Sequence, residues 1–251
     1  MRALVFAKRN AKEILRDPMS YAFCLGVPIL LLIIMRLAFY SEQTKIMFGL
    51  ETLTPGIVVF SFAFVALYTA MLVSKDKATS FLLRLYTSPM KTVDFLLGYA
   101  LPGFVIAIGQ AIACWITATI ISLATGDELN IARGLLSIVT QLPSAVMFIG
   151  IGLLFGTLFS DKAAPGITSI VITASGILGG AWTPVETLNS GFQTVCKAMP
   201  FYPGTLIGRQ VYSNSIDDQF GWGWISLIAW TILIAVIAIA AFSARAKSDN
   251  K

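Results

Sequence analysis

The chain has 251 residues, of which 57% are apolar and only 12% are charged, and its mean hydropathy is +0.80. Soluble domains carry roughly 25% charged residues, so this composition excludes an ordinary soluble protein and predicts one compact, all-α membrane domain over residues 1–251. The net charge of +5 comes from cations that gather between long apolar runs, which predicts contact with anionic membrane lipids and no nucleic acid.

Residues 1–17 are the first predicted element, an amphipathic interfacial helix. Its apolar side chains, among them Leu4, Ala11 and Ile14, share one face, while its cations take the other face, a pattern typical of helices that lie on a membrane surface. Pro18 lacks an amide donor and ends the element. The alternative is that this basic segment serves only as a positive anchor on the cytosolic side.

Six apolar runs are long enough to cross a hydrocarbon core of about 30 Å. They cover residues 20–39, 54–73, 96–124, 131–160, 163–182 and 222–242. The third and fourth runs, of 29 and 30 residues, exceed that thickness, so they must tilt, protrude or kink, with Pro102 and Pro143 as the candidate kinks.

The distribution of Lys and Arg predicts the orientation of these spans. If the N-terminus lies in the cytosol, thirteen of the eighteen cations fall on the cytosolic side. The positive-inside rule therefore predicts a multi-pass protein of the cell (inner or plasma) membrane with both termini in the cytoplasm.

Residues 76–91 join the second and third spans on the predicted cytosolic side, yet they are too apolar for a solvated loop. Thr79 or Ser80 can cap a short helix there and Pro89 can end it. An apolar helix with interspersed cations on a cytosolic face is a docking element for lipid or for a partner protein.

Few polar side chains lie within the spans. Arg36 is near the outer end of the first span, where we expect it to snorkel to the headgroups. The hairpin tip between the third and fourth spans, residues 125–130, is short and acidic. Gln110 and Gln141 either bridge helices by hydrogen bonds or contact a polar substrate.

The sequence argues against chemistry on this chain. It has no His, its cysteines are Cys24, Cys114 and Cys196, and no carboxylate lies within a span, so we expect no metal site, no catalytic residue and no carrier driven by protons or sodium. No Gly is followed by Lys, which excludes a P-loop. If ATP drives this protein, another chain binds it.

The predicted outer segment, residues 181–221, is too apolar for a free loop and is expected to pack against the membrane. Two half-length helices, residues 184–188 and 191–199, fit within a re-entrant region at 183–203.

Two stretches resemble one family of membrane proteins. The run SFLLRLYTSPM at residues 80–90, followed by DFLLGY at 94–99, resembles the coupling-helix segment of type-2 ABC export permeases, the ABC-2 membrane family. The run GILGGAWTPVETL at residues 176–188 resembles the family's re-entrant region. The chain departs from the pattern before the coupling helix, where many relatives carry acidic residues and a Gly but this chain has Lys75, Asp76, Lys77 and Ser80.

The resemblance implies six transmembrane helices, an interfacial helix, a cytosolic coupling helix and an outer re-entrant hairpin. It also implies a permease that dimerises with a second copy or a paralogue and recruits two ATP-binding subunits, which hold ATP and Mg. The implied contacts with these subunits are Phe81, Arg84, Leu85, Tyr86, Ser88, Pro89 and Met90. The alternative is a helix that rests on lipid.

The same resemblance places a translocation path at the dimer axis, between the second and fifth spans. The candidate lining residues are Phe60, Phe64, Tyr68, Thr168 and Thr173. The candidates for an outer gate or re-entrant region are Gly179, Gly180, Pro184 and Glu186. The competing interpretations are contact with lipid or packing for the aromatic residues, packing for the glycines, and exposure to external water for the glutamate.

The expected function is export of an amphipathic substrate by alternating access, with a drug or antimicrobial compound favoured. One alternative is export of a lipid-linked or polysaccharide product, which favours a wider and more polar path. The other is a membrane scaffold that transports nothing and uses the cytosolic helix for docking.

Overall fold

The computed structural model describes residues 2–17, 22–79 and 92–249, and these residues form helices without any strand. In chain order the helices are α1 (Arg2–Leu15), a π-helical turn η1 (Ala22–Gly26) that leads into α3 (Val27–Phe39), α4 (Lys45–Phe48), α5 (Leu50–Ala78), α7 (Thr92–Thr125), α8 (Ile131–Leu158), α9 (Ala164–Leu178), η2 (Val185–Thr187), α10 (Ser190–Ala198), α11 (Tyr202–Ser213) and α12 (Gln219–Asp249). The predicted all-α class is confirmed.

Within the described residues, four helices are long and apolar enough to cross a membrane. They are α5, α7, α8 and α12. The apolar helices Phe23–Phe39 and Ala164–Leu178 cover most of the first and fifth predicted spans but are shorter than these four. The count of six spans therefore stays a prediction, and the membrane character of the chain rests on the four long helices.

Helix α5 lies at the centre of the bundle. Of its most apolar 18-residue window, 89% is buried, against 22% for α12, which exposes its apolar side chains outward. Helix α8 packs closely on α5 through Gly152 and Gly156, where an added Cβ would lie 2.4 Å from the carbonyl oxygen of Ala66 and 2.7 Å from that of Ala70. Two glycines four residues apart allow this approach of helix backbones.

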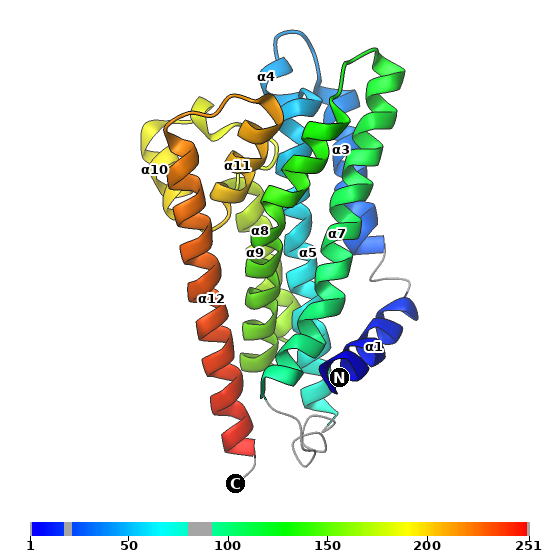
Figure 1. Ribbon diagram of the computed structural model, residues 1–251, viewed down its shortest axis with the longest axis vertical. Coiled ribbons are helices and arrows are strands. Elements are labelled where there is room, and N and C mark those ends of the chain that lie inside the picture. The colour runs from blue at the N-terminus through cyan, green and yellow to red at the C-terminus, as the bar shows by residue number, and fades with distance from the viewer. Residues whose placement is uncertain (1, 18–21, 80–91, 250–251) are drawn as a thin grey trace.

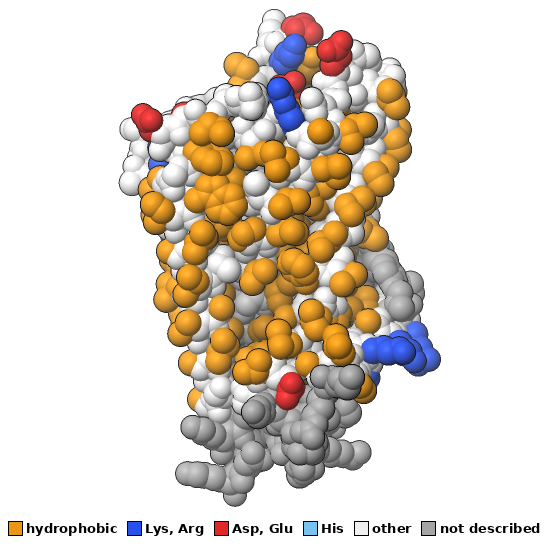
Figure 2. All heavy atoms as spheres, in the orientation of Figure 1, with side chains coloured by type: hydrophobic (Ala, Val, Ile, Leu, Met, Phe, Trp, Pro, Cys, Tyr) orange, Lys and Arg blue, Asp and Glu red, His pale blue; other side chains and the backbone are white. Residues whose placement is uncertain are grey.

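The bundle has two distinct ends. The long helices run along its length; α4, α10 and α11 lie at one end, and α1 lies obliquely at the other (Figure 1). The first residues of α1 and the last residues of α12 share that second end, which we call the α1 end (Figure 1). Apolar side chains cover the visible face between the ends, and charged side chains gather toward the ends (Figure 2).

Local sequence explains several helix boundaries. The side chain of Asn130 accepts a hydrogen bond from the amide of Arg133 at 3.0 Å and caps α8, and Asn189 caps α10 in the same way. Helix α11 ends at Asn214, whose φ of 55° is left-handed. Helices α7 and α8 continue through Pro102 and Pro143.

The outer segment contains more helix than the sequence predicted. The turn η2 and helix α10 occupy the stretches where two half-length helices were expected, and α11 follows them as a third element that was not predicted. Its two glycines face α8. An added Cβ would lie 2.0 Å from the side chain of Ser144 at Gly204, and 2.1 Å from the side chain of Gln141 at Gly208. Helix α11 thus belongs to the core of the bundle.

Candidate functional site

A polar cluster at the α1 end joins α1 to the ends of α5 and α7. Helix α5 ends at Ala78 and helix α7 begins at Thr92, so these two ends flank the predicted coupling residues Phe81, Arg84, Leu85, Tyr86, Ser88, Pro89 and Met90. Those seven residues lie outside the part of the chain that the structure describes. The cluster is therefore the described structure nearest to them along the sequence.

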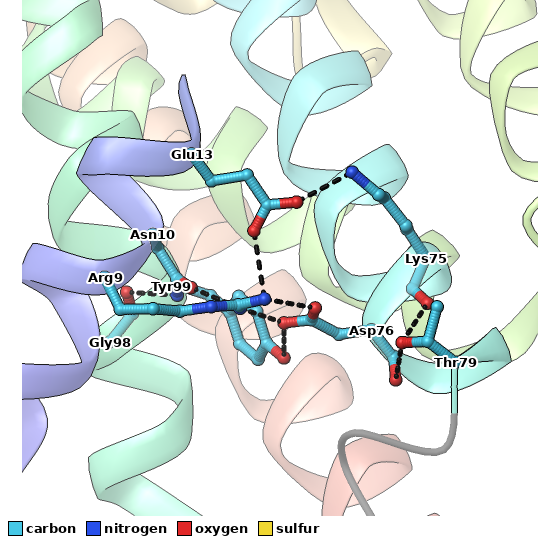
Figure 3. Close-up of polar contacts among 8 residues, drawn as sticks. All are labelled: Arg9, Asn10, Glu13, Lys75, Asp76, Thr79, Gly98 and Tyr99. Atoms are coloured by element: carbon cyan, nitrogen blue, oxygen red, sulfur yellow. Dashed lines mark hydrogen bonds and ion pairs between the residues drawn. The ribbon is translucent and has the colours of Figure 1, made fainter. Parts of the chain in front are cut away.

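Asp76 is the centre of this cluster. It is 2% exposed, and Arg9 of α1 donates two hydrogen bonds to its carboxylate, from Nη1 to Oδ2 at 2.5 Å and from Nη2 to Oδ1 at 2.9 Å (Figure 3). The hydroxyl of Tyr99 on α7 donates to Oδ2 at 2.9 Å. One buried carboxylate thus connects three helices, and its charge is matched by a two-pronged guanidinium contact.

Helix α1 is held by further contacts. Glu13 accepts from Arg9 at 3.0 Å and from Lys75 of α5 at 2.7 Å (Figure 3). The side-chain amide of Asn10, which is fully buried, donates to the carbonyl of Gly98 at 3.0 Å. Gly98 leaves room for the ring of Phe6, which an added Cβ would approach to 2.2 Å.

Lys77 connects the end of α5 to the end of α8. Its ammonium donates to the carbonyl oxygens of Gly156, Thr157 and Phe159 at 3.1, 2.8 and 2.6 Å. The last carbonyls of a helix lack partners within the helix and carry partial negative charge, so a cation there is favourable. A displacement of the end of α5 would therefore reach α1, α7 and α8.

The charge of Arg9 suits this arrangement. Burial alone lowers the pKa of an arginine, but the hydrogen bond and the negative charge of Asp76 outweigh burial and raise the pKa of Arg9. The guanidinium of Arg9 is thus held in its charged form. The sequence signal for it was the charged run Lys75, Asp76 and Lys77 at the end of an apolar helix, noted only as a departure from the family pattern.

The candidate path residues differ in their surroundings in the described chain. Phe60 contacts Phe64 and Trp182, each at 5.4 Å between ring centroids, and both phenylalanines are buried. Thr168 is buried and bonded to its own helix, while Thr173 is exposed. Tyr68 lines a cavity beside α1. Their role in a path stays a prediction.

One of the candidate gate residues, Gly180, contacts an arginine that the sequence did not single out. Arg209 of α11 donates to the carbonyl oxygens of Thr52 at 2.9 Å and Gly180 at 2.6 Å, which ties α11 to α5 and to the end of α9. Burial lowers its pKa to about 10, so the guanidinium stays charged. The feature of the sequence that could have indicated Arg209 is an arginine inside an apolar outer segment.

Turn geometry explains two of the gate candidates. Gly180 has a φ of +63°, a left-handed conformation that favours glycine. An added Cβ at Gly179 would lie 2.2 Å from the carbonyl oxygen of Ser175. Pro184 is buried before η2, and Glu186 accepts a hydrogen bond from the hydroxyl of Tyr202 on α11. The glutamate therefore orders this region, although its side chain is exposed.

The polar residues within the bundle bridge helices. The amide of Gln110 donates to the carbonyl of Cys24 in the turn η1, and the amide of Gln141 donates to the carbonyl of Pro55 at 2.9 Å. Both side chains are buried. Hydrogen bonding between helices thus accounts for both residues, as one of the two interpretations expected.

The expectation for Arg36 is wrong. Its side chain is 3% exposed, pairs with Asp127 of the outer hairpin tip, and has its Cζ 3.2 Å from the centroid of the Tyr40 ring. A carboxylate within reach replaces the headgroups as its partner. Hydrogen bonds from Thr125 and then from Arg36 favour the ionised form and lower the pKa of Asp127, although burial opposes this.

Among the described residues no group of three or more His, Cys, Asp or Glu side chains is placed to hold a metal ion. Cys24, Cys114 and Cys196 are buried free thiols.

A family model described as ABC-2 type transporter matches residues 2–212. The match includes α1, the polar cluster, residues 80–91 and α11 almost to its end, and it stops before α12. No curated protein matches the chain.

Proposed function

The chain belongs to the ABC-2 type transporter family, and from this premise we propose that it is the permease subunit of an ATP-driven exporter that moves an amphipathic compound out of the cell. The match over residues 2–212 is the observation that carries the proposal. A drug or antimicrobial compound is the favoured substrate.

ATP hydrolysis belongs to a partner in this proposal. The chain has no P-loop sequence, so two ATP-binding subunits supply ATP, Mg and the chemical step. They dock on Phe81, Arg84, Leu85, Tyr86, Ser88, Pro89 and Met90. Leu85 and Tyr86 fill an apolar groove of the ATPase, as buried anchors do at interfaces, and Arg84 pairs with a carboxylate.

The polar cluster supports a route for the movement. When the ATPase subunits close on ATP, they displace residues 80–91, which continue directly into α5 and α7. Asp76 links α5 to Arg9 and Tyr99, and Lys77 links it to the end of α8. These helix ends therefore move as one unit, and the displacement reaches the spans.

The substrate passes between two permease copies, along the faces of α5 and α9. Phe60 and Phe64 give α5 an aromatic character, and Thr168 and Thr173 give α9 a small polar one. An amphipathic organic compound suits such a wall better than an ion. Gly179, Gly180, Pro184 and Glu186 form the outer gate, which Arg209 contacts at the carbonyl of Gly180.

In the proposed topology the chain crosses the cell membrane six times, and the α1 end faces the cytoplasm. The four long apolar helices supply four crossings, and the helices Phe23–Phe39 and Ala164–Leu178 supply the other two. The first residues of α1 and the last of α12 lie at one end of the bundle (Figure 1), which supports termini on one side.

The test is purification of the tagged chain in mild detergent, with mass spectrometry of its partners and an ATPase assay on the complex. We expect a cassette ATPase to co-purify. The change Arg84→Ala with Tyr86→Ala should abolish transport-coupled ATPase activity while the chain still inserts in the membrane.

The matched control is Arg133→Ala with Tyr40→Ala, which removes the same residue types from the other end of the bundle. That variant should keep the ATPase partner and its activity. A chain that purifies alone, without any ATPase, would refute the exporter and favour a membrane scaffold. Intact coupling in the Arg84 and Tyr86 variant would refute the docking assignment alone.

The substrate class is tested by measuring how amphipathic drugs affect the growth of cells that lack the protein. Increased sensitivity to amphipathic drugs, restored by the intact chain, is the expected result. Unchanged drug sensitivity with loss of a surface glycan would instead favour export of a lipid-linked or polysaccharide product.

A further inference from the structure

A cavity of about 1060 Å³ lies between α1 and α5 at the α1 end. It is large enough for a lipid headgroup, since small-molecule sites range from about 300 to 1,000 Å³. The role proposed for the chain leaves this cavity without an occupant.

One wall of the cavity is a row of cations on α1. Lys8, Lys12 and Arg16 are spaced by four residues and line the cavity together, as side chains on one face of a helix do. All three are exposed, and none forms an ion pair with another described residue. The opposite face of α1 buries Phe6 and Ile14, so the fold does not need these cations.

The other wall is apolar and belongs to α5. Tyr68, Met71 and Leu72 line the cavity at spacings that share one helix face with Lys75. Tyr68 lies seven residues before Lys75, about 10 Å farther from the α1 end at 1.5 Å per residue. The cavity is therefore cationic toward the α1 end and apolar deeper in the bundle.

The acidic side chains at the cavity leave its cations in excess. Glu13 is bound to Arg9 and Lys75, so its charge is already matched. Lys8, Lys12 and Arg16 then remain against the other two acids of the lining, Asp17 and Asp161. An anion is thus favoured over a cation.

We propose that this cavity binds the phosphate headgroup of an anionic phospholipid of the adjacent leaflet, with Lys8, Lys12 and Arg16 contacting the phosphate and with Tyr68 and Met71 contacting the start of the acyl chains. An amphiphile matches both walls, whereas free phosphate matches only the cationic one. Bound lipid would hold α1 against α5 beside Glu13, and so would steady the polar cluster. The proposal depends on the proposed function only for the leaflet, which is the cytoplasmic one.

The experiment measures lipid binding directly by native mass spectrometry of the full chain, titrated with phosphatidylglycerol or phosphatidylcholine. We expect phosphatidylglycerol to bind at least about tenfold more tightly, because each Lys or Arg near a membrane surface favours anionic lipid. Lys8→Gln, Lys12→Gln and Arg16→Gln combined should abolish the preference. Equal binding of the two lipids by the intact chain would overturn the proposal.

The matched control replaces three cations elsewhere, as Lys45→Gln, Arg133→Gln and Lys197→Gln, which changes the net charge equally. It should keep the preference, and an equal loss in this control would mean that overall charge, not the cavity, attracts the lipid. Met71→Trp fills the apolar side without changing charge and should weaken phosphatidylglycerol binding. Unchanged binding in Met71→Trp would overturn the cavity as the site.

Inorganic phosphate distinguishes the two sources of the anion. We expect it to leave the melting temperature unchanged at concentrations where phosphatidylglycerol raises it. Equal stabilisation by inorganic phosphate would overturn a lipid site. None of these readouts uses ATP or transport, so failure here leaves the exporter proposal standing, and the reverse also holds.

Discussion

The pair formed by Arg9 and Asp76 offers the sharpest test of how the ends of the helices are joined. In Arg9→Gln the carboxylate of Asp76, whose side chain is 3% exposed, keeps among the described side chains the hydroxyl of Tyr99 at 2.9 Å. Removing one partner of a buried pair costs about 3–5 kcal/mol. Since the side chain of Arg9 is 37% exposed, water can partly replace it, and we expect a loss of about 2–3 kcal/mol.

The reverse change, Asp76→Asn, should cost less. Arg9 then keeps its contact with Glu13 at 3.0 Å, and the new amide can still accept a hydrogen bond, so we expect a loss of about 1–2 kcal/mol. The double variant should lose less than the sum of the two, with a coupling energy of about 1–2 kcal/mol.

The assay is unfolding of the purified chain by titration with a denaturing detergent, followed by tryptophan fluorescence. Lys162→Gln is the control, because Lys162 is exposed and outside any ion pair among the described residues. It removes one charge and should leave stability unchanged. A loss below about 0.5 kcal/mol in Arg9→Gln, or strict additivity in the double variant, would refute a buried pair between α1 and α5.

Three further predictions concern other parts of the bundle. Gly156→Ala should destabilise the chain by about 1–3 kcal/mol in the same titration because its Cβ meets α5, whereas Gly109→Ala, with nothing within 4 Å, should be neutral or slightly stabilising. Arg209→Met should increase hydrogen exchange at residues 176–188 and leave α1 unchanged; equal exchange in both proteins would contradict its role in holding α9. Because the pKa of Asp127 is lowered in the folded chain, its contribution is present above the pKa of the unfolded chain and is lost as the pH falls through the folded value. The melting temperature of Asp127→Asn should therefore lie below that of the intact chain at pH 7, and this gap should begin to narrow below about pH 4 and close below the folded pKa; a gap independent of pH would contradict the ion pair with Arg36.

The family of the chain was readable from the sequence because two short runs carried the resemblance. The match over residues 2–212 agrees with that interpretation. The coupling residues within the first run lie outside the described structure, so their role stays a prediction. The second run contains Gly180, whose left-handed backbone explains one glycine of the run.

The outer segment shows where predicting helices from the length of apolar runs fails. The two half-length helices were predicted at residues 184–188 and 191–199, and no helix was predicted over residues 202–213. In the structure they form α11, whose Gly204 and Gly208 pack against α8. The sequence shows that these two glycines are four residues apart, but it does not show which helix face they pack against.

The sequence by itself determined the class of fold and the long apolar helices. In a hydrocarbon core the backbone must satisfy its own hydrogen bonds, so a long apolar run has to form a helix wherever it packs. These properties are local, and hydropathy along the chain is enough to read them.

Only the tertiary structure decided which polar side chains meet. Arg9 and Asp76 are 67 residues apart in sequence, Arg36 and Asp127 are 91 apart, and Arg209 reaches a carbonyl 157 residues away. Such pairs depend on which helix faces pack together, a choice set by the summed contacts of many side chains. For that reason an arginine expected to reach lipid headgroups is instead buried against a carboxylate.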